Sequence, residues 1–378
     1  MSANSSAIEG LIHSNRVIVC CGSGGVGKTT TSAALAIRAA QMGKRSVVIT
    51  IDPAKRLATS LGLQGLSSTP TDLTQNLGET VKGKFYAVMP NSEQTFEHFV
   101  RSMAKDQQNL AARVLKTSIY KIFTREFAGA HEYMAMEKLY ELAQDQTFDL
   151  IVLDTPPSAN TRVFLDAPNM LADFFDDQIM RWFVNPGAKI LATGIKKLLE
   201  ILERLTGRGF IAELFEFATA LFELRTQFKE NLEKVGQLLH QSDVAFLMVT
   251  SPERLSKVDT QDFVRLIGDR GYHFWGFVVN RVLSKRLGLS LESAVQTPSP
   301  SARIEQILAT QKNPVASPEE LKVLKESFAQ LHATLQHELD AALFLRQISR
   351  RESNVLMIEE QPSDVHSVPA LLRLCEQF

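Results

Sequence analysis

The strongest constraint on the fold is a short glycine-rich segment near the start of the sequence. Residues 22–29 read GSGGVGKT and match the pattern G-x-x-x-x-G-K-[ST] at every fixed position. An apolar, β-branched run precedes the segment at 16–21, an alanine-rich stretch follows at 30–41, and a second apolar run occupies 46–51. Short apolar runs are typical of buried strands, and Gly43 stands where a helix C-terminal cap belongs. The order strand, loop, helix, strand predicts a βαβ unit and a mostly parallel central sheet flanked by helices, the α/β class.

This glycine-rich loop has the residue types that a triphosphate-binding loop requires. Glycines allow several backbone N–H groups to converge on one phosphate, and the following helix N-terminus favours anions. Lys28 would bridge the β- and γ-phosphates, and the Thr29 hydroxyl would be a ligand of Mg²⁺. The alternative is a glycine-rich turn unrelated to nucleotide, which the strand before and the helix after disfavour. The predicted nucleotide-binding residues of the loop are Gly24, Gly25, Val26, Gly27, Lys28, Thr29 and Thr30.

A further apolar run, DLIVLD at 149–154, ends in an aspartate. In proteins with a phosphate-binding loop, an aspartate at this place holds Mg²⁺, usually through water. The alternative is an acidic residue that only ends a strand, but TPPS follows at 155–158 and gives a sharp exit. We therefore predict that Asp154 holds the metal ion through water, together with Thr29.

Composition and charge argue against several classes of function. The chain has 378 residues and a formal net charge of −1, so its overall field gives no reason to expect a nucleic acid partner. Residues 1–10 lack the basic and apolar regions of a secretory signal, and no run approaches the ~18 apolar residues of a membrane-spanning helix. These features predict a soluble, cytoplasmic protein.

The cysteines point the same way. Three cysteines cannot form a disulfide framework, which suits a reducing cytosol. Cys20 and Cys21 are consecutive on a predicted strand, so their side chains should point to opposite faces and cannot chelate one ion. Cys375 lies far away along the chain. The sequence therefore predicts neither a zinc site nor an iron–sulfur cluster, and Mg²⁺ is the metal ion that it implies.

Three segments, in this order, resemble the ArsA-type ATPases. They are GSGGVGKTT from residue 22, ITIDPAKRLA from residue 49 and LDTPPSANT from residue 153. This family covers the arsenite-pump ATPase subunit and the ATPase that delivers tail-anchored membrane proteins, with MinD and the nitrogenase iron protein as distant relatives. The resemblance extends from residue 16 to about residue 374. It implies a P-loop NTPase fold, ATP and Mg²⁺ as cofactors, and a dimeric enzyme.

The resemblance also implies roles outside the glycine-rich loop. In the family, the aspartate of the DPA segment (the first switch) positions the attacking water, and Asp52 stands there. Asp154 belongs to the second switch, and two carboxylates near a triphosphate would repel it unless one faces Mg²⁺ and the other faces water. Asp52 and Lys28 are therefore the predicted catalytic residues. Asn280, which ends the apolar run FWGFVVN, matches the position that reads adenine, and the loop after 355–358 resembles the segment that closes over the base.

Ser23 departs from the family pattern. Most members have a lysine there that reaches across a homodimer to the partner's phosphates, and a serine cannot do this. Substitute charges could come from Lys55 and Arg56, directly after the first switch, or from Arg162, after the second. An arginine supplied to the transition state contributes ~10³-fold or more in phosphoryl transfer. The alternative is that Lys55 and Arg56 are solvated charges at a helix start.

Two helical tracts, about 92–146 and about 166–240, are predicted as an inserted subdomain of a single P-loop ATPase domain that spans 1–378. The second tract and its edge are rich in phenylalanine: Phe164, Phe174, Phe175, Phe183, Phe210, Phe215, Phe217, Phe222 and Phe228. Two interpretations stay open. The helices form a subdomain that packs on itself, or they form an exposed apolar groove for a hydrophobic client or a membrane-protein partner.

Together these features predict a Mg²⁺-dependent ATPase of the ArsA type that works as a nucleotide-switched dimer, either a homodimer or a heterodimer with a paralogue. Three narrower functions stay open. A targeting factor or chaperone for tail-anchored proteins is supported by the phenylalanine-rich tract and weakened by the absence of a C-x-x-C pair. An arsenite-pump subunit is disfavoured by the missing cysteines. A MinD-like positioning ATPase would need a membrane-binding tail, for which the final residues LLRLCEQF are too short.

Overall fold

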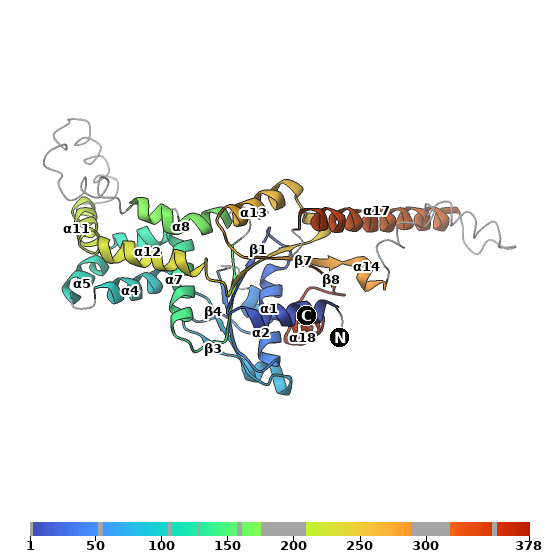
Figure 1. Cartoon of the computed structure of the whole chain (residues 1–378), viewed down its shortest axis with the longest axis horizontal. Helices are drawn as coiled ribbons and strands as arrows, with labels where there is room; N and C mark the ends of the chain where they lie inside the picture. Colours follow the sequence, from blue (N-terminus) through green and yellow to red (C-terminus); the bar gives the residue numbers. More distant parts are fainter. Residues whose placement is uncertain are drawn as a thin grey trace, which may run out of the picture.

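A sheet of eight strands runs through the centre of the protein (Figure 1). The computed structural model describes residues 3–51, 56–104, 107–126, 129–156, 161–174, 209–288, 318–349 and 354–378. The strands are β1 (Val17–Cys21), β2 (Arg45–Thr50), β3 (Thr71–Asp72), β4 (Lys84–Val88), β5 (Leu150–Asp154), β6 (Val244–Thr250), β7 (Phe274–Val282) and β8 (Asn354–Glu359). Their spatial order is β3-β4-β2-β5-β1-β6-β7-β8, and every adjacent pair is parallel except β3 with β4. The predicted α/β class, with a mostly parallel sheet, is confirmed.

The strand order gathers four loops at one edge of the sheet. β5 and β6 flank β1, and β2 lies on the far side of β5. In this register Cys20 aligns with both Asp154 and Leu247, and Thr50 aligns with Asp154. Because neighbouring strands are parallel, the loops after β1, β2, β5 and β6 leave the same edge. Open α/β sheets bind ligands at this edge, where the strand order reverses.

Helices from both ends of the chain cover one face of the sheet. They are α1 (Ala3–Ser14), α2 (Lys28–Gln41), the short α3 (Arg56–Ser60), the 3₁₀ helix η1 (Thr74–Thr80) and α18 (Val368–Cys375). Ile18 and Cys20 of β1 point into the core that these helices form with the sheet. α18 packs on α2, and the two ends of the chain lie near each other (Figure 1).

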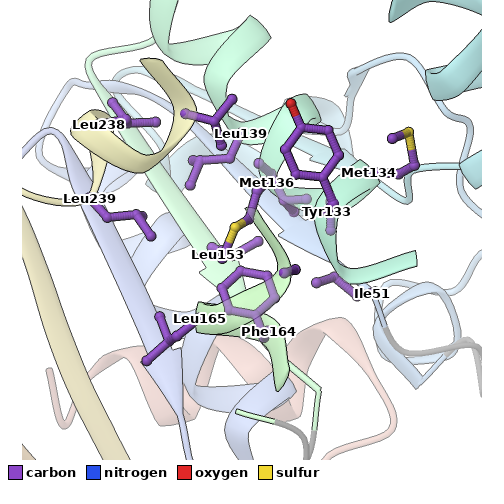
Figure 2. Close-up of a cluster of buried hydrophobic side chains, with 14 of the residues drawn as sticks. Ile51, Tyr133, Met134, Met136, Leu139, Leu153, Phe164, Leu165, Leu238 and Leu239 are labelled. Atoms are coloured by element: carbon purple, nitrogen blue, oxygen red, sulfur yellow. The ribbon is translucent and has the colours of Figure 1, made fainter. Parts of the chain in front are cut away.

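A larger group of helices covers the opposite face. They are α4 (Ser92–Met103), α5 (Gln108–Lys116), α6 (Ile119–Glu126), α7 (Ala130–Gln144), α8 (Thr161–Phe174), α11 (Phe210–Glu223), α12 (Arg225–Leu238) and α13 (Lys257–Asp269). Figure 2 shows the contact between the layers, where Leu153 of β5 packs against Met136 of α7 and Phe164 of α8. Cys21 belongs to this core and Cys20 to the other, which confirms that the two cysteines point to opposite faces.

All three cysteines are free and buried. Burial raises the pKa of the Cys21 and Cys375 thiols to about 12, and burial also raises the pKa of Cys20. These thiols are therefore protonated at neutral pH, although the thiolate is the form that binds metals and attacks electrophiles. The cysteines act as small apolar core residues.

Aromatic side chains connect the helices of the larger group. Phe228 of α12 contacts Phe99 of α4 edge to face, with 4.6 Å between the ring centroids, and Phe123 of α6 lies 5.7 Å from Phe217 of α11. Phe164 is also fully buried, whereas Phe210, Phe215 and Phe222 are only partly buried. Offset and edge-to-face pairs stabilise such packing beyond the area that they bury. The side chains of Phe174, Phe175 and Phe183 lie outside the described residues, so the choice between a closed core and an open groove stays a matter of prediction.

A buried polar network joins α7 to α12. The Glu137 carboxylate accepts hydrogen bonds from the Tyr133 hydroxyl at 2.9 Å and from the Asn231 side-chain amide at 2.6 Å. Glu137 is only 9% exposed. Burial disfavours the charged carboxylate and raises its pKa to about 7, despite the two donors, which favour the charged form. Glu137 therefore changes its charge inside the core near neutral pH.

Replacing Glu137 by glutamine is expected to remove part of the pH dependence of stability. The pKa of Glu137 is raised in the folded state above the ordinary value of 4.5, so the folded state binds the proton more tightly. The contribution of Glu137 to the free energy of unfolding is then greatest below about pH 4.5 and falls as the pH rises towards 7, by up to roughly 3 kcal/mol. Urea unfolding at pH 5 and pH 8 should show a larger loss in the wild type than in Glu137→Gln. Equal losses would contradict the assignment.

A long helix, α17 (Pro318–Ile348), extends away from the sheet (Figure 1). The Glu338 carboxylate anchors it, because it accepts hydrogen bonds from the backbone N–H groups of Leu283 and Ser284 at the start of α14 (Leu283–Arg286). Within the described ranges, none of the helices combines the length and apolar character needed to cross a bilayer.

Candidate functional site

The loop between β1 and α2 adopts a conformation that depends on its glycines. Gly27 has φ +92°, and a Cβ atom at this residue would clash with the side-chain amide of Asn280. Gly22 approaches the backbone carbonyl of Val249 in β6 so closely that it also leaves no room for a side chain. Both positions therefore need glycine. The loop leads directly into the N-terminus of α2, where the helix dipole favours an anion.

Lys28 is the first residue of α2 and folds back over the loop. Its ammonium group donates a hydrogen bond to the backbone carbonyl of Ser23 at 2.8 Å, and the residue is only 7% exposed. The backbone of the loop thus holds the lysine side chain beside the N-terminus of α2. A cation in this position, among backbone N–H groups, suits the β- and γ-phosphates of a nucleotide.

Thr29 and Asp154 are brought together from distant parts of the sequence. The Thr29 hydroxyl donates to the Asp154 carboxylate at 2.7 Å, and the Thr50 hydroxyl at the end of β2 donates to the same oxygen at 2.9 Å. Asp154 is 2% exposed. The group offers hydroxyl and carboxylate oxygens, which are the ligands that Mg²⁺ prefers.

These residues fit a magnesium ion that arrives with a nucleotide. Among the described residues, no cluster of three or more His, Cys, Asp or Glu side chains is placed to hold a metal ion. Mg²⁺ is usually bound by one or two protein ligands, several waters and substrate phosphates, so one carboxylate and one hydroxyl are a sufficient set. Thr29 and Asp154 would hold such an ion.

A cavity of about 1140 Å³ opens above the loop. Its walls come from the loop and α2, the ends of β2 and β5, and the start of α7. The turn after β6, the end of β7 and the segment after β8 complete them. The lining residues include Gly24, Gly25, Gly27, Lys28, Thr29, Thr30, Ile51, Glu132, Asp154, Arg254, Asn280 and residues 360–366. The Ser60 hydroxyl of α3 donates to the carbonyl of Val365 at 2.9 Å and closes one side. The volume is large enough for a nucleoside triphosphate.

Asn280 lies on β7 against the glycine-rich loop. Its side-chain amide donates a hydrogen bond to the carbonyl of Val26 at 3.0 Å, and Asn280 also lines the cavity. β7 continues to Val282, so Asn280 does not end the strand as the sequence suggested. The residue is well placed beside a nucleotide, and its role in reading adenine stays a prediction.

For the other predicted site residues, the structure gives less information on their relation to the cavity. Asp52 and Lys55 lie outside the described residues, although Ile51, which directly precedes Asp52, lines the cavity. Arg56 begins α3, and its side chain is outside the description. Arg162 is exposed on α8 and does not line the cavity. The roles predicted for these four residues therefore stay predictions.

The cavity also contains charged residues that the sequence did not indicate. Arg254 ends the short 3₁₀ helix η4 (Pro252–Arg254), and Arg281 follows Asn280 with φ +61°. His131 and Glu132, in the first turn of α7, line the cavity from the side of the larger helical group. Arg254 could have been found from the sequence because it follows β6, the strand next to β1. However, β6 itself was not identified from the sequence.

Fold and site together define a P-loop nucleotide-binding protein: a phosphate-binding loop follows the central strand, and a hydroxyl–carboxylate pair lies beside the loop lysine. The chain belongs to the family described as anion-transporting ATPases, whose pattern matches residues 15–291. The resemblance found in the sequence is thereby confirmed, and the chain is a member of a family of ATPases.

Relatives at low identity carry two kinds of names. The ATPase GET3 of Malassezia globosa is 24% identical over 273 residues, which cover 70% of this chain and 72% of the relative. The ATPase ASNA1 homolog 1 of Paramecium tetraurelia is 26% identical over 271 residues, 69% of this chain and 73% of the relative. A protein of Prosthecochloris vibrioformis, provisionally named arsenical pump-driving ATPase, is 24% identical over 275 residues, 72% of this chain. The chain covers 61% of that last protein, less than two thirds of its length.

Proposed function

We propose that this protein binds ATP with Mg²⁺ in the cavity above the glycine-rich loop and hydrolyses it. The observation that carries the proposal is the convergence of Lys28, Thr29 and Asp154 at the N-terminus of α2, with Thr29 and Asp154 only 2.7 Å apart. Family membership supports the same activity. The chain would act as a single ATPase domain, 1–378, in which the helices within 92–146 and 166–240 form an inserted subdomain.

Each group at the site has a role in this proposal. The loop N–H groups and Lys28 bind the phosphates, and Thr29 and Asp154 would hold Mg²⁺, which would neutralise phosphate charge. Asp52 orients the water that attacks the γ-phosphorus, and the bond from that phosphorus to the bridging oxygen breaks to release ADP. Asn280 and the segment 360–366 surround the base. Positioning and electrostatic stabilisation account for most catalysis of phosphoryl transfer.

The finer proposal is a dimeric switch whose nucleotide state controls a hydrophobic client or a membrane-protein partner. α7 supports this coupling, because His131 and Glu132 line the cavity while Tyr133 and Glu137 bond to α12 through Asn231. A nucleotide in the cavity and the helix α12 would therefore both contact α7. The phenylalanine-rich tract is the proposed client surface, as in an ATPase that targets tail-anchored proteins. We propose a cytoplasmic location for this activity.

The test of the proposed activity is phosphate release from ATP in the presence of Mg²⁺ or EDTA. Hydrolysis is expected only with Mg²⁺, and GTP should be a poorer substrate. Arsenite should not stimulate turnover, because the thiols of Cys20, Cys21 and Cys375 are buried and their pKa values are raised. Hydrolysis that persists in EDTA would contradict the magnesium site. Clear stimulation by arsenite would favour a pump-driving function instead.

A further inference from the structure

Arg254 lies directly beside the glycine-rich loop, although it is far away in the sequence. β6 is paired with β1, and Cys21 at the end of β1 aligns with Met248. The chain leaves β6 at Thr250 and turns through η4, whose last residue is Arg254. The turn after β6 and the loop after β1 are therefore neighbours at the same edge of the sheet.

The guanidinium group of Arg254 rests against Gly25. From the position that a Cβ atom of Gly25 would occupy, Cζ of Arg254 is 3.6 Å away, Nε 3.7 Å and Nη1 3.9 Å. The arginine is exposed and lines the cavity together with Lys28. Within the described ranges the guanidinium has no hydrogen-bond or ion-pair partner, and the adjacent Glu253 does not pair with it.

Groups of both charges line the cavity, and the acidic ones include Glu132, Asp154 and Glu253. The loop N–H groups, the N-terminus of α2 and the Lys28 ammonium provide positive charge at the loop itself. A second cation against this loop is repelled by the first, and that repulsion is offset when a multiply charged anion enters the cavity. A guanidinium has a rigid fork of donors that suits phosphate oxygens. Arg254, which follows β6, and Lys28, which follows β1, thus line the same cavity.

We propose that Arg254 binds the phosphate chain of the nucleotide held by the loop of the same polypeptide. This inference rests on the proposed function and adds a phosphate-binding residue from the turn after β6. In this role Arg254 contributes charge and hydrogen bonds alone. Ser23 removes a cation from the loop, and Arg254 supplies one beside it.

Calorimetry with ATP and with inorganic tripolyphosphate tests the proposal. Arg254→Ala is expected to weaken binding of both ligands by the same factor, roughly 10- to 150-fold, as for loss of a hydrogen bond to a charged group. Arg254→Lys should lie between Arg254→Ala and the wild type, because it keeps the charge and loses the fork. Arg265→Ala, an exposed change on α13, is the matched control and should bind both ligands like the wild type.

The outcomes separate this inference from the proposed function. If Arg254→Ala weakens ATP but not tripolyphosphate, the arginine contacts the base and the inference is wrong. Unchanged binding of both ligands overturns it as well, while the proposed function stands as long as Lys28→Ala weakens ATP binding. A wild-type protein that binds neither ligand contradicts the proposed function itself. Should Arg254→Ala unfold, the two affinities of Arg254→Lys decide the matter by the same comparison.

Discussion

Replacing Lys28 by alanine is expected to weaken ATP binding roughly 10- to 150-fold, because a hydrogen bond to a charged group contributes about 1.5–3 kcal/mol. Hydrolysis should fall below detection, since the lysine would bridge the two phosphates between which the bond breaks. The structure places this ammonium group at the N-terminus of α2, held by the carbonyl of Ser23. Isothermal titration calorimetry with ATP measures the binding and phosphate release measures the turnover.

Lys234→Ala is the control for this experiment, because Lys234 is exposed on α12 and does not line the cavity. Thermal unfolding of Lys28→Ala should accompany the titration, since the change also removes the hydrogen bond to Ser23. A folded Lys28→Ala protein with wild-type affinity for ATP would remove the glycine-rich loop from the nucleotide site.

Replacing Asp52 by asparagine is expected to leave ATP binding close to that of the wild type while hydrolysis slows by ~10²-fold or more. A positioned base or water-orienting group contributes about 10²- to 10⁴-fold, and asparagine keeps the shape of the side chain but loses its charge. Single-turnover hydrolysis with saturating ATP measures the chemical step directly. The ATP-bound Asp52→Asn protein is also the bait with which to capture a client or a second subunit.

Two further variants show what the Asp52 result means. Asp154→Asn should impair binding of the magnesium–ATP complex, because its carboxylate lies beside Thr29, so its defect differs from that of Asp52→Asn. Asp262→Asn, an exposed change on α13, should behave like the wild type. If Asp52→Asn hydrolyses ATP at the normal rate, another residue positions the water, and the second switch is the place to search.

The parts of the fold that were predictable are those with local signals. The runs around β1, α2 and β2 have strand or helix patterns bounded by glycine or proline, and the predicted bounds differ from the observed ones by one or two residues. Asp154 was identifiable because it ends an apolar run. It was predictable that Lys28, Thr29 and Asp154 line one cavity, because the carboxyl ends of parallel strands lie at the same edge of a sheet.

Other parts depend on contacts that no local pattern encodes. β6 is apolar at nearly every residue and fully buried, and a run of this kind has neither strand nor helix periodicity. Because β6 was not identified, its place next to β1 was unknown, and so was the approach of Arg254 to Gly25. β4 and the helix α1 were likewise not predicted. The network of Tyr133, Glu137 and Asn231 joins residues 94 and 98 positions apart, which sequence spacing does not reveal.

The hydrogen bond between Ser60 and Val365 joins residues 305 positions apart, so the two walls of the cavity are made at very different times. A ribosome adds about 5–20 residues per second, so roughly 15–60 s separate the synthesis of one wall from that of the other. During this interval the growing chain already contains the glycine-rich loop but lacks both the segment after β8 and α18. The apolar surface of α2 that α18 later covers is exposed on the ribosome. The cavity above the glycine-rich loop is therefore complete only once residues 360–366 have been synthesised.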